Sequence, residues 1–234
     1  MRWAVYSPLA YYLLLPLLKV YPMQPDEAIE LAEKSFDLSL SPEQVALLVQ
    51  YVDLLTDWSA RVRLVSRNDR NFIWERHILD CLSLVPHLPI DGPLLDLGSG
   101  AGLPGIVIKI MRSDLEVYLL EPARMKTLFL KETITVLNLQ DTFAIRSRAE
   151  TLVGDSSFSG KFLIGTARAV ARLPQLWHWV EPLLAPQGVL IAMKGPDSLS
   201  EFANGVPDHI YAAETTLTLP FTRRKRSFVF LKRC

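Results

Sequence analysis

Apolar and polar positions follow two different patterns along the chain, and the change falls near residue 90. Between residues 26 and 88 the apolar positions recur at the spacing of a helix buried on one face, for example at Val45, Leu48 and Val52. The segment S-P-E-Q at residues 41–44 offers a capping serine followed by a proline, which is typical of a helix start. This pattern predicts a small helical region.

After residue 93 short apolar runs alternate with longer amphipathic segments, the pattern of a parallel sheet with crossover helices. A final pair of apolar runs has no helix between them and predicts an antiparallel hairpin at one edge of the sheet. The pattern therefore predicts an α/β fold. The predicted strands are 94–97, 117–120, 142–145, 162–165, 189–193, 210–219 and 227–231, and the predicted helices are 103–111, 125–137 and 173–184.

The first residues differ from the rest of the chain. Residues 3–18 carry no charge and resemble a secretory or membrane segment, but the run is short for a span, contains two prolines and lacks an A-x-A-like cleavage site. Translation from Met23 is an alternative interpretation. We expect an apolar extension of unclear status at residues 1–22, a helical region at 23–90 and a catalytic domain at 91–234.

Composition narrows the class of protein. The chain has 234 residues, half of them apolar, which suits one main core. Its 25 basic and 25 acidic residues balance, so affinity for a polyanion must come from local patches. The cysteines are Cys81 and Cys234, which give neither a disulfide framework nor metal-ligand spacing. We therefore expect a cytoplasmic protein without a metal.

The segment LLDLGSGAGLPG carries the candidate cofactor loop and supports two interpretations. Gly100, Gly102 and Gly105 satisfy G-x-G-x-x-G, which is typical of a dinucleotide site. Asp96 followed by Gly98, Gly100 and Gly102 satisfies D-x-G-x-G-x-G, which favours S-adenosylmethionine. In an open parallel sheet a ligand lies beyond the carboxyl ends of the strands, where this loop falls.

Asp96 discriminates between the two cofactors. A carboxylate beside the loop would repel a pyrophosphate, whereas S-adenosylmethionine carries a sulfonium and no phosphate. A structural alternative is that Asp96 caps the amides of its own loop. Glu121 ends the second strand, where it can accept hydrogen bonds from ribose hydroxyls in either cofactor. The S-R-A-E segment at residues 147–150 follows the third strand and could place Glu150 near an adenine edge.

Several segments resemble the small-subunit ribosomal RNA guanine-N7 methyltransferases, also called the glucose-inhibited division protein B family. The resemblance covers the chain from about Val52 to its end, and the flanking motifs are more specific than the glycine loop. They are Trp58, ERHILDCLSL from Glu75, LLDLGSGAGLPG, SRAE, TARAVARL from Thr166, MKG from Met193 and RSFVFLK from Arg226.

The resemblance implies a Rossmann-like class I S-adenosylmethionine-dependent methyltransferase fold and a set of site residues. It also places basic positions near the RNA or the active cleft. The chain departs from the family at Arg63-Leu64-Val65, where relatives usually have Asn-Leu-Thr. The implied cofactor contacts are Gly98, Leu103, Ala149, Glu150 and Arg168, with Glu121 near the ribose, and the basic positions are Arg76, His77, Arg148, Lys194 and Arg226.

Guanine N7 exposes a lone pair, so methyl transfer to it needs positioning and no general base. His77, Arg148 and Lys194 are therefore candidates for positioning the substrate. The chain contains no Asn-Pro dipeptide of the kind found in exocyclic-amine methyltransferases. Cys81 falls in a predicted helix, which favours packing over the nucleophilic thiolate that pyrimidine C5 enzymes need.

Two basic clusters could contact RNA. One holds Arg63, Arg67 and Arg76 with interleaved aromatic residues, and the other is the run Arg223, Arg224, Lys225 and Arg226. The alternative is that these charges are solvated surface.

The resulting hypothesis is a monomeric methyltransferase that acts on 16S ribosomal RNA or on the small ribosomal subunit. A small-molecule methyltransferase and a non-catalytic ribosome-assembly protein are the alternatives. Asp96 disfavours a nicotinamide-dependent dehydrogenase.

Overall fold

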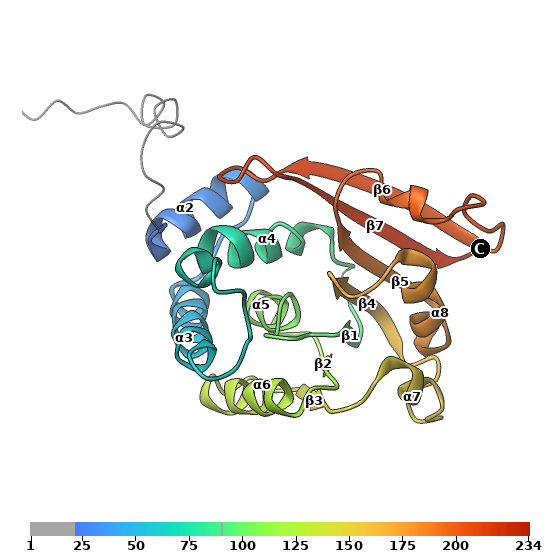
Figure 1. Cartoon of the computed structure of the whole chain (residues 1–234), viewed down its shortest axis with the longest axis horizontal. Helices are drawn as coiled ribbons and strands as arrows, with labels where there is room; N and C mark the ends of the chain where they lie inside the picture. The colour runs from blue at the N-terminus through green and yellow to red at the C-terminus, as the bar shows by residue number, and fades with distance from the viewer. Residues whose placement is uncertain (1–21, 90) are drawn as a thin grey trace, which may run out of the picture.

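The computed structural model describes residues 22–89 and 91–234, so our interpretation of residues 1–21 lies outside the described part. Seven strands form one sheet in the order β3-β2-β1-β4-β5-β7-β6 (Figure 1). The first five strands in this order are parallel, and β7 and β6 continue the sheet antiparallel. The strands are β1 (Leu94–Leu97), β2 (Val117–Leu120), β3 (Thr142–Ile145), β4 (Phe162–Arg168), β5 (Leu184–Lys194), β6 (Ile210–Thr218) and β7 (Lys225–Arg233).

The α/β fold predicted from the alternation is confirmed, including the antiparallel hairpin at the edge. Several boundaries were wrong. Strand β4 runs to Arg168 instead of residue 165, and β7 covers Lys225–Arg233 instead of 227–231. The largest difference is at the start of β5. The predicted helix 173–184 ends at Val180, a 3-10 turn follows at Glu181–Leu183, and β5 already begins at Leu184. Pro182 explains the early stop, because a proline cannot donate the backbone hydrogen bond that a continuing α-helix requires.

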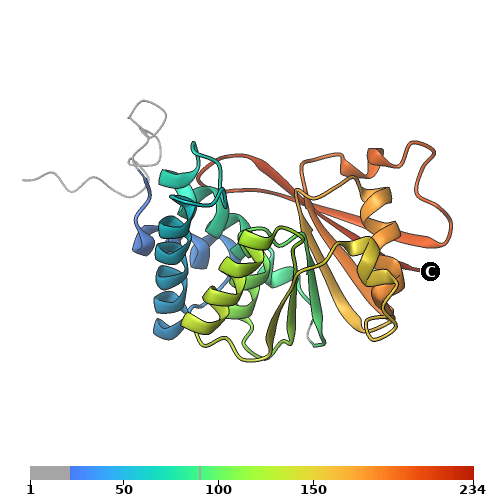
Figure 2. The same cartoon turned by 60° about the horizontal axis from the view of Figure 1, so that its bottom comes forward.

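Helices cover both faces of the sheet (Figures 1 and 2). Because side chains alternate along a strand, Leu94 contributes to the apolar cluster on one face and Leu95 to the cluster on the other. The helical region packs on the first of these faces. The helices are α2 (Pro25–Phe36), α3 (Pro42–Ser59), α4 (Leu79–Leu82), α5 (Gly105–Met111) and α6 (Arg124–Val136) on that face, with α7 (Ala149–Val153) and α8 (Leu173–Val180) on the other.

In the described part of the chain, no helix is both long enough and apolar enough to cross a membrane.

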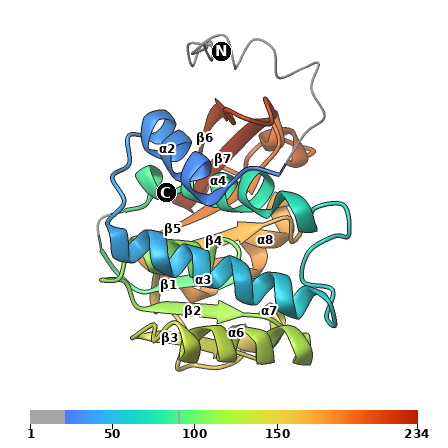
Figure 3. The same ribbon diagram turned by 90° about the vertical axis from the view of Figure 1, so that its left-hand side faces the viewer.

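Helix α3 connects the helical region to the glycine loop. Its start has the predicted cap, since the Ser41 hydroxyl accepts a hydrogen bond from the Gln44 amide at 3.2 Å. The helix packs against α5 and α6 (Figure 3). Tyr51 projects from it, fully buried, and its hydroxyl donates a 2.6 Å hydrogen bond to the Ala101 carbonyl. The helical region therefore supports the loop directly.

Replacing Tyr51 with phenylalanine is expected to lower the free energy of unfolding by about 1–2 kcal/mol, because the buried Ala101 carbonyl loses its partner. Urea unfolding measures this change. Tyr211→Phe is the matched control, because Tyr211 is half exposed and should lose close to nothing. Equal losses in the two variants would contradict the support that we assign to Tyr51.

Candidate functional site

The loop between β1 and α5 requires glycine at its turning points. Gly98 and Gly102 have positive φ values of 64° and 86°. A Cβ added at Gly98 would lie 2.9 Å from a methyl carbon of Val170, and one added at Gly102 would lie 2.5 Å from Ile106. Any side chain at these positions is thus strained by the backbone conformation and by its neighbours. The loop consequently presents backbone at the carboxyl edge of the sheet.

Asp96 holds this loop from beneath. Its side chain is fully buried, with Oδ2 accepting from the Gly105 amide at 3.1 Å and Oδ1 from the Thr166 hydroxyl at 2.9 Å. Burial raises the pKa of Asp96 to about 6, although these hydrogen bonds oppose the rise. The structure therefore places Asp96 in the capping arrangement that the sequence left open, and Asp96 does not line the cavity above the loop.

The titration of Asp96 predicts a pH dependence of stability. Its pKa is higher in the folded state than the ordinary value of 3.8, so its contribution is most favourable at low pH and is lost as pH rises through about 6. Between pH 4.5 and 7 we expect the free energy of unfolding of the wild type to fall by about 2 kcal/mol relative to Asp96→Asn. Urea unfolding at both pH values measures the difference, and a constant difference would contradict the assignment.

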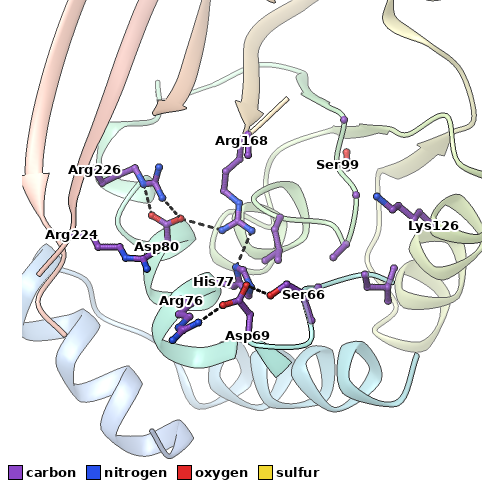
Figure 4. Close-up of a pocket in the computed structure, with 17 residues that line it drawn as sticks. Ser66, Asp69, Arg76, His77, Asp80, Ser99, Lys126, Arg168, Arg224 and Arg226 are labelled. Atoms are coloured by element: carbon purple, nitrogen blue, oxygen red, sulfur yellow. Dashed lines mark hydrogen bonds and ion pairs between the residues drawn. The ribbon is translucent and has the colours of Figure 1, made fainter. Parts of the chain in front are cut away.

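A cavity of about 460 Å³ opens beyond the carboxyl ends of β1 and β4 (Figure 4). Its lining comes from the glycine loop, from the segment preceding β1, from α6 and from the hairpin between β6 and β7. The volume suits a ligand of nucleoside size. The polar and charged lining residues are Ser66, Asp69, Arg76, His77, Asp80, Ser99, Lys126, Arg168, Arg224 and Arg226.

Asp80 joins two arginines from distant strands at the cavity wall. The carboxylate is almost fully buried and accepts two hydrogen bonds from Arg226, at 2.6 and 2.9 Å, and one from Arg168 at 3.1 Å. Arg226 also donates to the Lys194 carbonyl at 3.0 Å. This network links the ends of β4 and β7 to the helical region and fixes the orientation of both guanidinium groups.

His77 lies next to Arg168 and is uncharged at neutral pH. Burial and the neighbouring Arg168 charge lower the pKa of His77 to about 4. Its Nδ1 lies 3.1 Å from a guanidinium nitrogen of Arg168. Because a guanidinium only donates, Nδ1 is the acceptor, which assigns the ring proton to Nε2. Nε2 faces Asp69 at 3.9 Å, beyond hydrogen-bond range.

Asp69, which lies next to His77, already has hydrogen-bond partners of its own. Its carboxylate accepts hydrogen bonds from the Ser66 hydroxyl at 2.6 Å and from Arg76 at 2.5 Å. Although burial opposes the shift, these bonds lower the pKa of Asp69. The Arg76 guanidinium also lies over the Phe72 ring, 4.7 Å from its centroid. Arg76 is therefore oriented by its neighbours rather than free in solvent.

The residues proposed from the sequence for cofactor binding divide into two groups. Gly98, Gly100, Leu103 and Arg168 line the cavity. The others lie beneath it or beside it. Gly102 and Asp96 shape the loop, Glu121 accepts hydrogen bonds from the Gly100 and Ala123 amides, and Ala149 and Glu150 begin α7 outside the cavity.

The basic and catalytic candidates divide in the same way. His77, Arg76, Arg224 and Arg226 line the cavity, whereas Lys194 lies outside it and forms an ion pair with Glu201 at 2.9 Å. Arg148 precedes α7 and is exposed. The remaining RNA candidates, Arg63, Arg67, Arg223 and Lys225, are exposed and do not line the cavity.

Sequence analysis missed Asp80 and Lys126 as site residues. Asp80 interrupts the apolar run I-L-D-C-L, and an acid buried in such a run requires hydrogen-bond donors or a cationic partner. That signal was available, although it did not name the partners. Lys126 lies five residues after Glu121, in the first turn of α6, and nothing in its spacing marks it as a cavity residue.

Comparison with known proteins gives consistent matches. A family model described as rRNA small subunit methyltransferase G matches residues 44–229. A ribosomal RNA small subunit methyltransferase G of Nocardioides is 38% identical over 166 residues, which cover 71% of this chain and 65% of the relative. One from Syntrophus aciditrophicus is 35% identical over 209 residues, which cover 86% of this chain and 87% of the relative.

Similarity to solved structures confirms the fold. The structure of a predicted O-methyltransferase from Agrobacterium tumefaciens superposes with a TM-score of 0.53 at 18% identity, covering 64% of this chain and 79% of the other. That likeness supports the Rossmann-like arrangement of strands and helices.

Proposed function

Because the chain belongs to the rRNA small subunit methyltransferase G family, we propose that it transfers a methyl group from S-adenosylmethionine to N7 of a guanine in 16S ribosomal RNA. The supporting observation is the cavity at the carboxyl edge of the sheet, which combines a glycine loop with a cationic rim. The enzyme acts in the cytoplasm, as a monomer, on naked 16S RNA or on the small subunit.

The residues present fit S-adenosylmethionine. The floor of the cavity is backbone at Gly98 and Gly100, where a side chain would occupy ligand space or clash with Val170. In our proposal Gly98, Gly100 and Leu103 hold the methionine part, Arg168 pairs with its carboxylate, and Glu121 lies near the ribose. When bound, the cofactor supplies an electrophilic methyl group on a positively charged sulfur.

The chemistry at guanine N7 agrees with the protein groups around the cavity. The N7 lone pair forms the new bond to carbon while the carbon–sulfur electron pair stays on sulfur, and no proton must leave first. The neutral state of His77 at pH 7 suits this reaction, because a positive charge develops on the purine during transfer. Catalysis then depends on holding the two reactants in line.

A thiolate mechanism does not fit the described site. Cys81 is fully buried, and burial raises the pKa of its thiol to about 12. At neutral pH the thiolate that a pyrimidine C5 methyltransferase needs is therefore almost absent at Cys81.

The test uses small ribosomal subunits, and separately their naked RNA, from a strain that lacks the modification. The protein is incubated with labelled S-adenosylmethionine, and the digested RNA is examined for 7-methylguanosine by mass spectrometry. The expected product is 7-methylguanosine at one position, and the more active substrate shows whether assembly is required. Cofactor binding without labelled nucleoside would refute the proposal and favour a small-molecule methyltransferase or an assembly protein.

A further inference from the structure

The side chains that line the cavity carry more positive than negative charges. Among the described residues that line it, five carry positive charge and two carry negative charge. His77 adds no charge at pH 7 because its pKa is about 4. The wall therefore holds an excess of three positive charges, although the whole chain has none.

The two carboxylates account for three of these cations. Asp80 is bound by Arg168 and Arg226, and Asp69 is bound by Arg76. Lys126 and Arg224 are left, and within residues 22–89 and 91–234 the structure gives neither side chain a hydrogen bond or an ion pair. Lys126 is half-buried and Arg224 is exposed, so both can reach a ligand at the opening.

The cofactor does not explain this excess. At neutral pH S-adenosylmethionine carries a sulfonium, an ammonium and one carboxylate, so it is itself a net cation. Even with Arg168 assigned to that carboxylate, two unpaired cations would repel the cofactor rather than hold it. A ligand with further negative charge is required, and RNA carries one phosphate for each nucleotide.

The positions of Lys126 and Arg224 suggest how such a ligand lies. Lys126 comes from α6 and Arg224 from the hairpin between β6 and β7, and they are drawn at opposite sides of the cavity in Figure 4. Arg168 and His77 lie between them in the same view. A nucleotide whose base enters the cavity between these elements places one backbone phosphate toward each side.

We propose that Lys126 and Arg224 bind the two phosphates that flank the methylated nucleotide, so that the base is held in the cavity from both sides of the RNA backbone. This inference rests on the proposed function. It adds Lys126 to the RNA-contacting residues, and it assigns Arg224 a defined phosphate rather than a place in a general basic surface.

The test compares Lys126→Gln, Arg224→Gln and the double variant with the wild type. Lys131→Gln is the matched control, because Lys131 lies on the same helix, is exposed and does not line the cavity. Binding of the small-subunit RNA is measured between about 50 and 200 mM salt, a range over which counterion release changes the affinity strongly. Binding of S-adenosylhomocysteine is measured by calorimetry.

Each single substitution is expected to raise the Kd for RNA roughly fivefold and to lower the slope of log affinity against log salt by about 0.7–1, with the double variant showing about twice the change in slope. The control should keep the wild-type slope. Affinity for S-adenosylhomocysteine should stay unchanged in all variants, which also shows that they are folded.

Two results would overturn the proposal. Weaker binding of S-adenosylhomocysteine by Lys126→Gln would assign this lysine to the cofactor's carboxylate, and unchanged salt slopes would remove both residues from the RNA contact. The wild type is assayed for 7-methylguanosine in parallel. Absence of that product would refute the proposed reaction, and the salt slopes would still decide whether the two residues bind phosphate.

Discussion

Replacing Asp80 with alanine is expected to lower the free energy of unfolding by about 3 kcal/mol, the largest stability effect that we expect from one substitution in the cavity wall. The carboxylate accepts three hydrogen bonds from Arg168 and Arg226, and its removal leaves both guanidinium groups without their anion. We place the loss at the lower end of the range for broken buried pairs, because both arginines retain some contact with solvent.

Urea unfolding at pH 7 tests this expectation against a surface pair. Glu30→Gln removes the charge of the Glu30–Lys34 ion pair on α2, where both side chains are about two thirds exposed, and it should cost less than about 0.5 kcal/mol. Asp80→Asn removes the negative charge but keeps the side-chain volume and one acceptor oxygen, so its loss of stability measures the contribution of the charge. A loss in Asp80→Ala no larger than that in Glu30→Gln would show that the network does not stabilise the fold.

Replacing Gly98 with valine is expected to raise the Kd for S-adenosylhomocysteine more than about 100-fold, which corresponds to about 3 kcal/mol, while the fold persists. Two causes act together. Gly98 has a φ of 64°, a conformation that β-branched residues rarely adopt, and a Cβ there would lie 2.9 Å from Val170. The added side chain also projects from the floor of the cavity.

Gly160→Val is the matched control for backbone strain. Gly160 has nearly the same φ, 63°, but is exposed and has open space around its missing side chain. Both variants should lose about 1–2 kcal/mol of stability from the left-handed conformation. Calorimetric titration should then show loss of binding only in Gly98→Val, and retained affinity in that variant would refute the assignment of the loop to the cofactor.

Much of the fold could be predicted from local pattern. The first three strands match their predicted limits. Each is a four-residue segment made mainly of apolar residues, which is the pattern expected of strands in a parallel sheet. The limits of β5 could not be predicted in the same way. Its first residues, Leu184–Gly188, include a proline and a glycine, and the segment is joined to β4 by the pairing of Leu184 with Phe162, after which the register shifts.

Only part of the candidate site could be predicted from the sequence. The glycine loop was identified because positive φ values restrict the residue type locally. The partner of a charged residue has no such local signature. Lys194 was proposed for the cleft and instead pairs with Glu201, seven positions away, whereas Lys126 was overlooked and lines the cavity.

By itself the sequence determined the order of strands and helices, the glycine loop and the family, because periodicity and backbone conformation are properties of short segments. Only the tertiary structure decided which charges neutralise one another. Asp80 meets Arg168 across 88 positions and Arg226 across 146, and no short-range pattern encodes such a meeting. Asp80 binds Arg168 and Arg226, and Asp69 binds Arg76, so Lys126 and Arg224 are left unpaired among the charged residues that line the cavity in the described structure.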